Sequence, residues 1–86
     1  MKIIKIGAMW CPACLIMNKR LKQVIDMTNI EVISYDYDLD EDIVKKYNVG
    51  QVLPELIFVD NDNCEINRLI GEQSIDQIVE IIESSC

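Results

Sequence analysis

Two cysteines separated by two residues stand where a predicted strand gives way to a predicted helix, and this pair strongly limits the possible folds. Cys11 and Cys14 follow an apolar run at residues 3–6, which is typical of a strand covered on both faces. A helical pattern begins at Pro12, and proline suits the first helical position because no N–H is left unpaired there. Once the intervening residues are wound into the first turn, the two sulfurs can approach to bonding distance. The pattern favours dithiol–disulfide exchange.

The position of the first cysteine predicts different roles for the two thiols. Cys11 stands at the helix N-terminus, where unpaired N–H groups and the helix dipole favour a thiolate. Cys14 lies one turn further in and is predicted to be more buried. The alternatives for such a pair are half of a zinc site or two inert cysteines. Against zinc, the chain has no histidine, and Cys64 and Cys86 are far apart and isolated. We therefore predict a redox pair with no metal and no bound cofactor.

Length and charge narrow the class of protein further. The 86 residues are expected to form a single domain, 1–86, and no apolar run is long enough to span a membrane. The chain opens directly with the predicted strand and without a charged, apolar leader, so a cytoplasmic location is expected. The net charge of −7 argues against nucleic acid or an anionic membrane as a partner, because both require clustered cations.

The remaining pattern predicts an alternation of strands and helices. The first helix runs from Pro12 to about Met27, with its apolar positions at Leu15, Leu21, Val24, Ile25 and Met27 and with Cys14 and Met17 nearby. A β-branched strand is predicted over 30–35. The acidic stretch 36–42 opens a short helix, for which Asp38 and Glu41 resemble a capping box.

The second half of the chain predicts a hairpin and a final helix. Pro54 introduces a strand over 56–59, a turn follows at 60–63, and residues 64–70 alternate as the paired edge strand. Ser74 and Gln77 form a second predicted capping box at the start of the last helix. The order β-α-β-α-β-β-α predicts an α/β fold in which helices cover both faces of a four-stranded mixed sheet.

At this point the chain resembles the thioredoxin family, in a minimal form of glutaredoxin size. Four features carry the resemblance: Trp10-Cys11-Pro12-Ala13-Cys14 after the first strand, Lys46-Tyr47 at the end of the second helix, Val52-Leu53-Pro54 before the third strand, and Gly71 after the fourth. The resemblance implies a thioredoxin-like fold over nearly the whole chain.

The resemblance also implies roles for individual residues. Cys11 would attack the substrate disulfide and Cys14 would resolve the mixed disulfide. Pro54 would be cis and face the cysteines, and the backbone of Leu53 would pair with an extended substrate segment. Substrate binding would further involve Trp10, Pro12 and Gly71, which would lie around the docking surface.

Lys5 stands where thioredoxins carry a buried aspartate, and we expect it to tune the cysteine pair. A protonated Lys5 would favour the Cys14 thiolate, whereas a desolvated, neutral Lys5 could accept a proton. Alternatively, its stem packs in the sheet while its ammonium group reaches water. Glu55 is a candidate counter-charge for Lys5.

The predicted function is thiol–disulfide exchange by a small thioredoxin-like protein-disulfide reductase, active in cell redox homeostasis and electron transport. Its partners would be disulfide-containing proteins, with a reductase or a low-molecular-weight thiol as electron donor, and the protein would be a monomer. Two alternatives remain open: a glutaredoxin-like oxidoreductase that uses a small thiol, and a redox relay dedicated to one partner. Cys64 and Cys86 are not expected to be needed for turnover.

Overall fold

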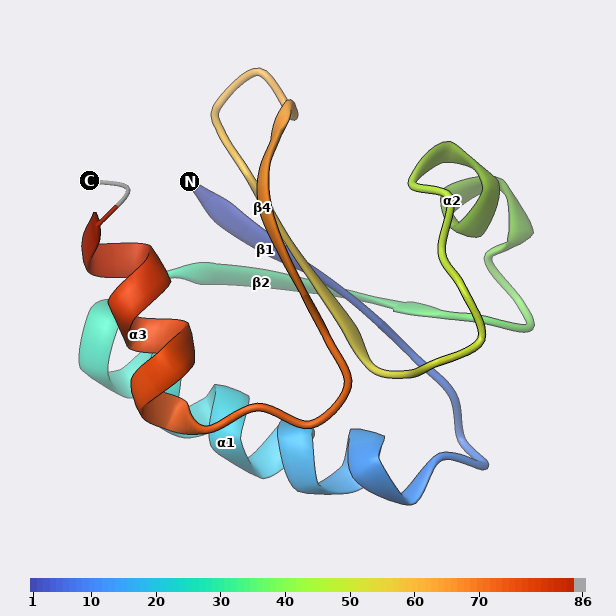
Figure 1. The fold of residues 1–86 in the computed structure, drawn as a ribbon, viewed down its shortest axis with the longest axis horizontal. Helices are drawn as coiled ribbons and strands as arrows, with labels where there is room; N and C mark the ends of the chain where they lie inside the picture. The colour runs from blue at the N-terminus through green and yellow to red at the C-terminus, as the bar shows by residue number, and fades with distance from the viewer. Residues whose placement is uncertain (85–86) are drawn as a thin grey trace.

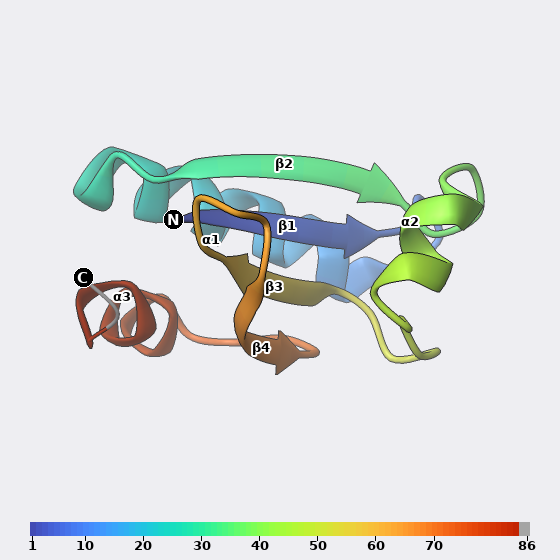
Figure 2. The same ribbon diagram turned by 90° about the horizontal axis from the view of Figure 1, so that it is seen from above.

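The computed structural model describes residues 1–84 of the chain. Its elements follow in the predicted order: β1 (Lys2–Gly7), α1 (Pro12–Thr28), β2 (Glu31–Asp36), α2 (Glu41–Lys46), β3 (Glu55–Val59), β4 (Glu65–Ile70) and α3 (Ile75–Ser84). Figure 1 shows the arrangement of these elements, and the view from above in Figure 2 shows the four strands as one mixed sheet in the order β2-β1-β3-β4. The predicted fold class is therefore confirmed.

Strand β1 runs through the interior of the sheet, and its pairing determines which loops meet. It pairs in parallel with β2 and antiparallel with β3, and β3 pairs antiparallel with the edge strand β4. In these registers Ile6 lies opposite Glu55, and Glu55 lies opposite Ile70. The end of β1, the start of β3 and the end of β4 therefore lie at the same end of the sheet.

Helices cover both faces of the sheet, as predicted. Helices α1 and α3 lie on one face and α2 lies on the other (Figure 1). Side chains alternate along β1 because successive residues of a strand point to opposite faces. Ile3 joins the cluster that includes Phe58 and the buried residues of α1 and α3, whereas Ile4 joins the cluster beneath α2.

Helix α1 begins and ends where its sequence indicates, but its buried side is narrower than predicted. Cys11 is the N-cap, and Asn29 ends the helix in the left-handed conformation with φ of 58°. The buried positions recur every three or four residues and are Cys14, Met17, Leu21 and Val24. The predicted core positions Leu15, Ile25 and Met27 are exposed instead, because they lie beside this stripe on a helix that packs on one side only.

The predicted cap of α2 is wrong, whereas that of α3 is confirmed. Helix α2 begins at Glu41 after Asp40, and no side chain caps it; the Asp36 carboxylate instead accepts the N–H groups of Asp38 and Leu39 in the preceding loop. Short carboxylates often satisfy such loop amides. Before α3, Ser74 N–H donates to the Gln77 side chain over 3.1 Å, and Gln77 N–H donates to the Ser74 hydroxyl over 3.2 Å.

Several strand boundaries also differ by one residue from the prediction, among them the start of β3 at Glu55 and the end of β2 at Asp36. Strand β2 begins at Glu31 because ladder pairing with β1 starts there, while Ile30 before it is buried in the core. Strand β4 begins at Glu65 rather than at Cys64, next to an irregularity of the ladder between Phe58 and Val59.

Candidate active site

Three loops meet at the end of the sheet where β1 ends. They are the cysteine turn before α1, the Leu53–Pro54 segment before β3, and Gly71 after β4. The Leu53–Pro54 peptide bond is cis, as predicted. Gly71 N–H donates to the Pro54 carbonyl over 2.8 Å. Gly71 has φ of +85°, a backbone conformation that glycine adopts without a steric penalty.

The Cys11 thiol lies against the proline segment. Cys11 is 7% exposed, and as N-cap it makes no side-chain bond to the helix. Its Sγ instead donates to the carbonyl oxygen of Leu53 at 3.6 Å. The pairing of β1 with β3 makes this contact possible, because it brings the end of β1 beside the start of β3.

Cys14 lies one helical turn beyond Cys11 and is more deeply buried, as predicted, with 2% of its surface exposed. Burial raises the pKa of the Cys14 thiol to about 11, and its interaction with the Cys11 thiol acts in the same direction. The backbone at Ala8 and the charge of Lys5 act in the opposite direction. Both cysteines are in the free thiol form, so the site is a dithiol in which Cys14 holds its proton firmly.

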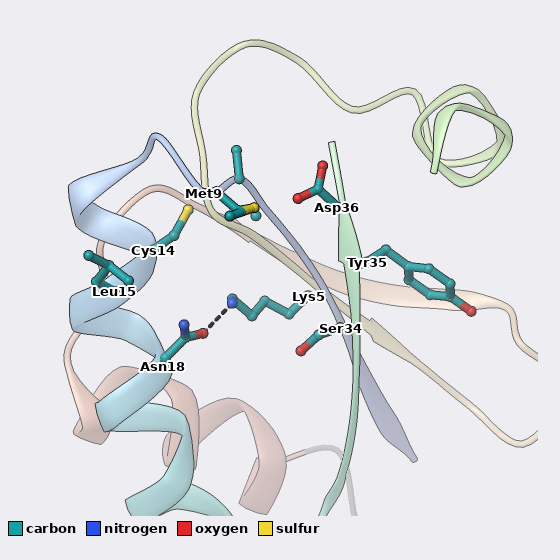
Figure 3. Close-up of a pocket in the computed structure, with 10 residues that line it drawn as sticks. Lys5, Met9, Cys14, Leu15, Asn18, Ser34, Tyr35 and Asp36 are labelled. Atoms are coloured by element: carbon teal, nitrogen blue, oxygen red, sulfur yellow. Dashed lines mark hydrogen bonds between the residues drawn. The ribbon is translucent and has the colours of Figure 1, made fainter. Parts of the chain in front are cut away.

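Lys5 extends from β1 toward α1, where its Nζ donates to Oδ1 of Asn18 (Figure 3). Lys5 is only 7% exposed. Its stem is therefore packed within the fold, as the alternative with a packed stem expects, and its ammonium group bonds to Asn18 at the edge of a pocket. Lys5 and Asn18 line a pocket of about 310 Å³ that also reaches Cys14, Met9 and Ser34.

Burial lowers the pKa of Lys5, and the nearby thiols of Cys14 and then Cys11 partly oppose this effect. The predicted counter-charge is wrong: Glu55 lies on the opposite face of the sheet, because the residue paired with Lys5 is Leu56. There the Glu55 carboxylate accepts Gly50 N–H and pairs with Arg68 at 3.0 Å.

The residues predicted to form the docking surface differ in exposure. Trp10 is 60% exposed, and its indole N–H donates to the Asp38 carboxylate over 2.8 Å. Pro12 is exposed and Gly71 is partly exposed. The side chains of Leu53 and Pro54 are buried, so this segment offers backbone more than side chain.

Sequence reasoning missed three polar partners of the site. Asn18 is exposed, as its polar character indicates, but it stands four residues after Cys14 and its amide oxygen also accepts from Lys5. Asp38 was read as a cap rather than as the partner of Trp10. Arg68 was not linked to Glu55, although both alternate onto the same face of adjacent strands.

The other cysteines lie apart from the dithiol. Cys64 is exposed in the turn between β3 and β4. Cys86 lies outside the described residues. Across residues 1–84, no three or more His, Cys, Asp or Glu side chains gather in a way that could hold a metal ion. Over the same span, no helix is long and apolar enough to cross a membrane.

A four-stranded mixed sheet of this topology, with a dithiol where β1 meets α1 and a cis-proline beside it, defines a thioredoxin-fold thiol–disulfide oxidoreductase. The model of the Thioredoxin family matches residues 1–84, and the chain belongs to that family. Thioredoxins need no cofactor for this chemistry. No curated protein matches the sequence.

Solved thioredoxins share the fold over most of the chain. Thioredoxin 1 from Thermosipho africanus TCF52B is 22% identical with a TM-score of 0.86, over 99% of this chain and 93% of that one. Thioredoxin-2 of the malaria parasite is 21% identical with a TM-score of 0.87, over 95% and 80%. Chloroplastic thioredoxin z is 27% identical with a TM-score of 0.81, over 95% and 74%. The chain is thus a protein-disulfide oxidoreductase of the thioredoxin family.

Proposed function

We propose that the protein works as a reductase of protein disulfides, with Cys11 as the attacking thiol and Cys14 as the resolving thiol. One observation carries this assignment. The Cys11 thiol lies at the start of α1 against the Leu53 carbonyl and is 7% exposed, while Cys14 is a turn behind it and 2% exposed. A helix N-terminus favours the thiolate needed for attack.

The reaction proceeds in two exchanges. The Cys11 thiolate attacks one sulfur of the substrate disulfide, a mixed disulfide forms, and the other substrate sulfur leaves as a thiolate that takes up a proton. Cys14 then loses its proton and attacks Cys11 Sγ. The mixed disulfide breaks, the second substrate sulfur leaves and is protonated, and the two electrons of the dithiol have passed to the substrate.

We propose that the substrate docks over the loops that surround Cys11. Trp10 offers an exposed aromatic surface beside the dithiol, and aromatic residues are enriched at interfaces. The backbone of Leu53 would align an extended substrate segment, with Pro54 packed beneath it. Pro12 and Gly71 would lie on either side, and the lack of a side chain at Gly71 leaves room for a backbone to approach.

Lys5 is the proposed tuning residue of the pair. Its positive charge acts on Cys14 in the direction that favours the thiolate, against the effect of burial. It would therefore matter most in the second exchange, when Cys14 must give up its proton.

The proposal includes a single domain over 1–86 that acts as a monomer in the cytoplasm, a compartment that keeps thiols reduced. A separate reductase or a low-molecular-weight thiol would return electrons to the oxidised pair. No bound cofactor or metal takes part.

An insulin-reduction assay tests the function. The protein is supplied with electrons either by a thioredoxin reductase system or by glutathione with its reductase. We expect turnover with the first system. Turnover with glutathione alone would assign the protein to the small-thiol class instead. Inactivity in both assays, with tight capture of a single protein through Cys11, would identify a dedicated relay.

A further inference from the structure

Lys5 is a buried cation whose hydrogen-bond partner carries no charge. Within residues 1–84 its side chain takes part in no salt bridge, and its Nζ donates to the neutral amide oxygen of Asn18. Burying an ammonium group without a counter-charge is costly, and proteins usually place a carboxylate beside it. Because Asn18 is uncharged, it does not neutralise the positive charge of Lys5. That charge can therefore act on the nearby Cys14 thiol.

The surroundings of Lys5 contain few other charges. Helix α1 presents the thiols of Cys11 and Cys14. From β2, Asp36 lines the same pocket, and one of its carboxylate oxygens is taken up by two loop N–H groups. The Tyr35 ring points away from Lys5 (Figure 3). On β3 the paired residue is the apolar Leu56.

Gly7 shows how closely the lysine and the thiol share this space. A Cβ atom at Gly7 would lie 3.3 Å from Cys14 Sγ and 3.3 Å from Lys5 Nζ. Both groups therefore border the same small volume at the end of β1. A larger residue at this position would crowd them.

We propose that Asn18 is a positioning residue that holds the Lys5 ammonium beside Cys14 without neutralising it, so that the resolving form of Cys14 is a thiolate paired with Lys5. This inference rests on the proposed role of Cys14 in the second exchange. Asn18 suits the task because it stands one turn after Cys14 on the same helix and reaches Lys5 from that side (Figure 3).

The proton balance of the step is simple. A neutral Lys5 amine takes the proton from the Cys14 thiol, or a protonated Lys5 stabilises the thiolate after the proton has left to water. Both routes produce the same thiolate–ammonium pair. The thiolate then forms a bond to Cys11 Sγ, the bond from Cys11 to the substrate sulfur breaks, and the substrate leaves as a thiolate. The pocket of about 310 Å³ beside Lys5 gives the proton a path to solvent.

A single-turnover experiment isolates this step. In a full chain with Cys64→Ser and Cys86→Ser, a mixed disulfide between Cys11 and thionitrobenzoate is formed, and release of the coloured thiol by Cys14 is followed against pH in a stopped-flow instrument. The variants are Lys5→Met, Asn18→Leu and the double variant. Lys22→Met and Gln23→Leu, which change exposed residues on α1, are matched controls.

Lys5→Met is expected to slow release about tenfold at pH 7 and to shift the rising limb of the pH profile upward, because the lysine's charge favours the Cys14 thiolate. Asn18→Leu should act in the same direction, by about threefold, and should add nothing in the Lys5→Met background, because the two residues act as one unit. The controls should match the parent protein.

Two results would overturn the proposal: a wild-type pH profile for Asn18→Leu, or an effect of Asn18→Leu that persists undiminished without Lys5. Thermal melts of each variant separate a folding defect from a shifted profile. Failure of the proposed function would look different. The insulin assay would then be negative, while release of the coloured thiol from Cys11 would still report on Lys5 and Asn18.

Discussion

The thiol of Cys11 lies 3.6 Å from the carbonyl oxygen of Leu53, although 42 positions separate the two residues in sequence. The contact joins the dithiol to the backbone on which a substrate segment is proposed to dock. A disulfide held along this segment would bring one sulfur next to Cys11 and not next to Cys14, which lies deeper. The proposed order of attack, first by Cys11 and then by Cys14, is thus consistent with the way β1 and β3 pair.

Trapping of substrates should follow this order. Cys14→Ser is expected to accumulate mixed disulfides through Cys11, because the second exchange is blocked. Cys11→Ser should trap almost nothing through the pair, since the Cys14 thiol that remains there is buried and has a pKa raised to about 11. Non-reducing gels and mass spectrometry of the trapped species provide the measurement, with Cys64→Ser as the control. Equal trapping by both variants would remove the assignment of Cys11.

Trp10 should matter for protein substrates more than for small disulfides. Trp10→Ala is expected to raise KM for insulin about tenfold, the loss of roughly 1.4 kcal/mol that an interface aromatic commonly provides. The rate with a small aromatic disulfide should change little, because no docking surface is needed. Asp38→Asn keeps a hydrogen-bond acceptor for the indole and serves as the mild comparison. A parallel loss on both substrates would mean that Trp10 supports the dithiol and does not contribute to docking.

Arg68 should be important for stability, although it lies outside the dithiol. It pairs with the Glu55 carboxylate, which directly follows Pro54 and has only 2% of its side chain exposed. Arg68→Met would leave that buried charge unpaired and should cost about 3 kcal/mol in the free energy of unfolding. The comparison variant Arg20→Met breaks a partly exposed pair with Glu72 and a hydrogen bond to the Gln73 carbonyl, and should cost about 1 kcal/mol. Urea unfolding curves compare the two, and equal losses would contradict a buried role for Glu55.

The positions of the helices and strands could be predicted from the sequence, because a helix start or a strand depends mainly on residues close to it in the chain. Pro12 after Cys11 indicates the start of α1, and Ser74 with Gln77 indicates the start of α3. The cysteine pair and Pro54 were predicted in their observed arrangement through the resemblance to thioredoxins. The order of elements followed from hydrophobic periodicity.

The partners of charged groups could not be read in the same way. Glu55 was expected near Lys5, but whether two residues share a face depends on the register between strands, and a shift of one residue reverses the answer. Asn18 is exposed, and its polarity alone does not indicate that its amide also reaches the buried Lys5. The capping role of Asp38 failed because loop amides compete for the same carboxylates.

Lys5 should lower the stability of the fold while it assists the chemistry. Burial lowers its pKa, so the folded protein binds this proton less tightly than the unfolded chain, and the penalty applies at every pH below the folded pKa. Lys5→Met removes the penalty and is expected to stabilise the reduced protein at pH 7 by about 1 kcal/mol, a typical gain where function has retained an unfavourable residue. The exposed Lys22→Met should leave stability unchanged.

The pH dependence of unfolding separates the contributions of Lys5 and Cys14 because their signs are opposite. The raised pKa of Cys14 contributes stability that is complete below the ordinary thiol value of 9.0 and is lost as the pH rises through about 11. The lowered pKa of Lys5 relieves a penalty as the pH rises toward 10.5, and so offsets part of that loss. Between pH 9 and 11, reduced Lys5→Met should therefore lose stability more steeply than the parent protein, while Cys14→Ser should lose less. Urea unfolding under a phosphine reductant at several pH values measures these slopes. The same curves at pH 7 test the penalty itself. If Lys5→Met is less stable than its parent there, the lysine stabilises the fold.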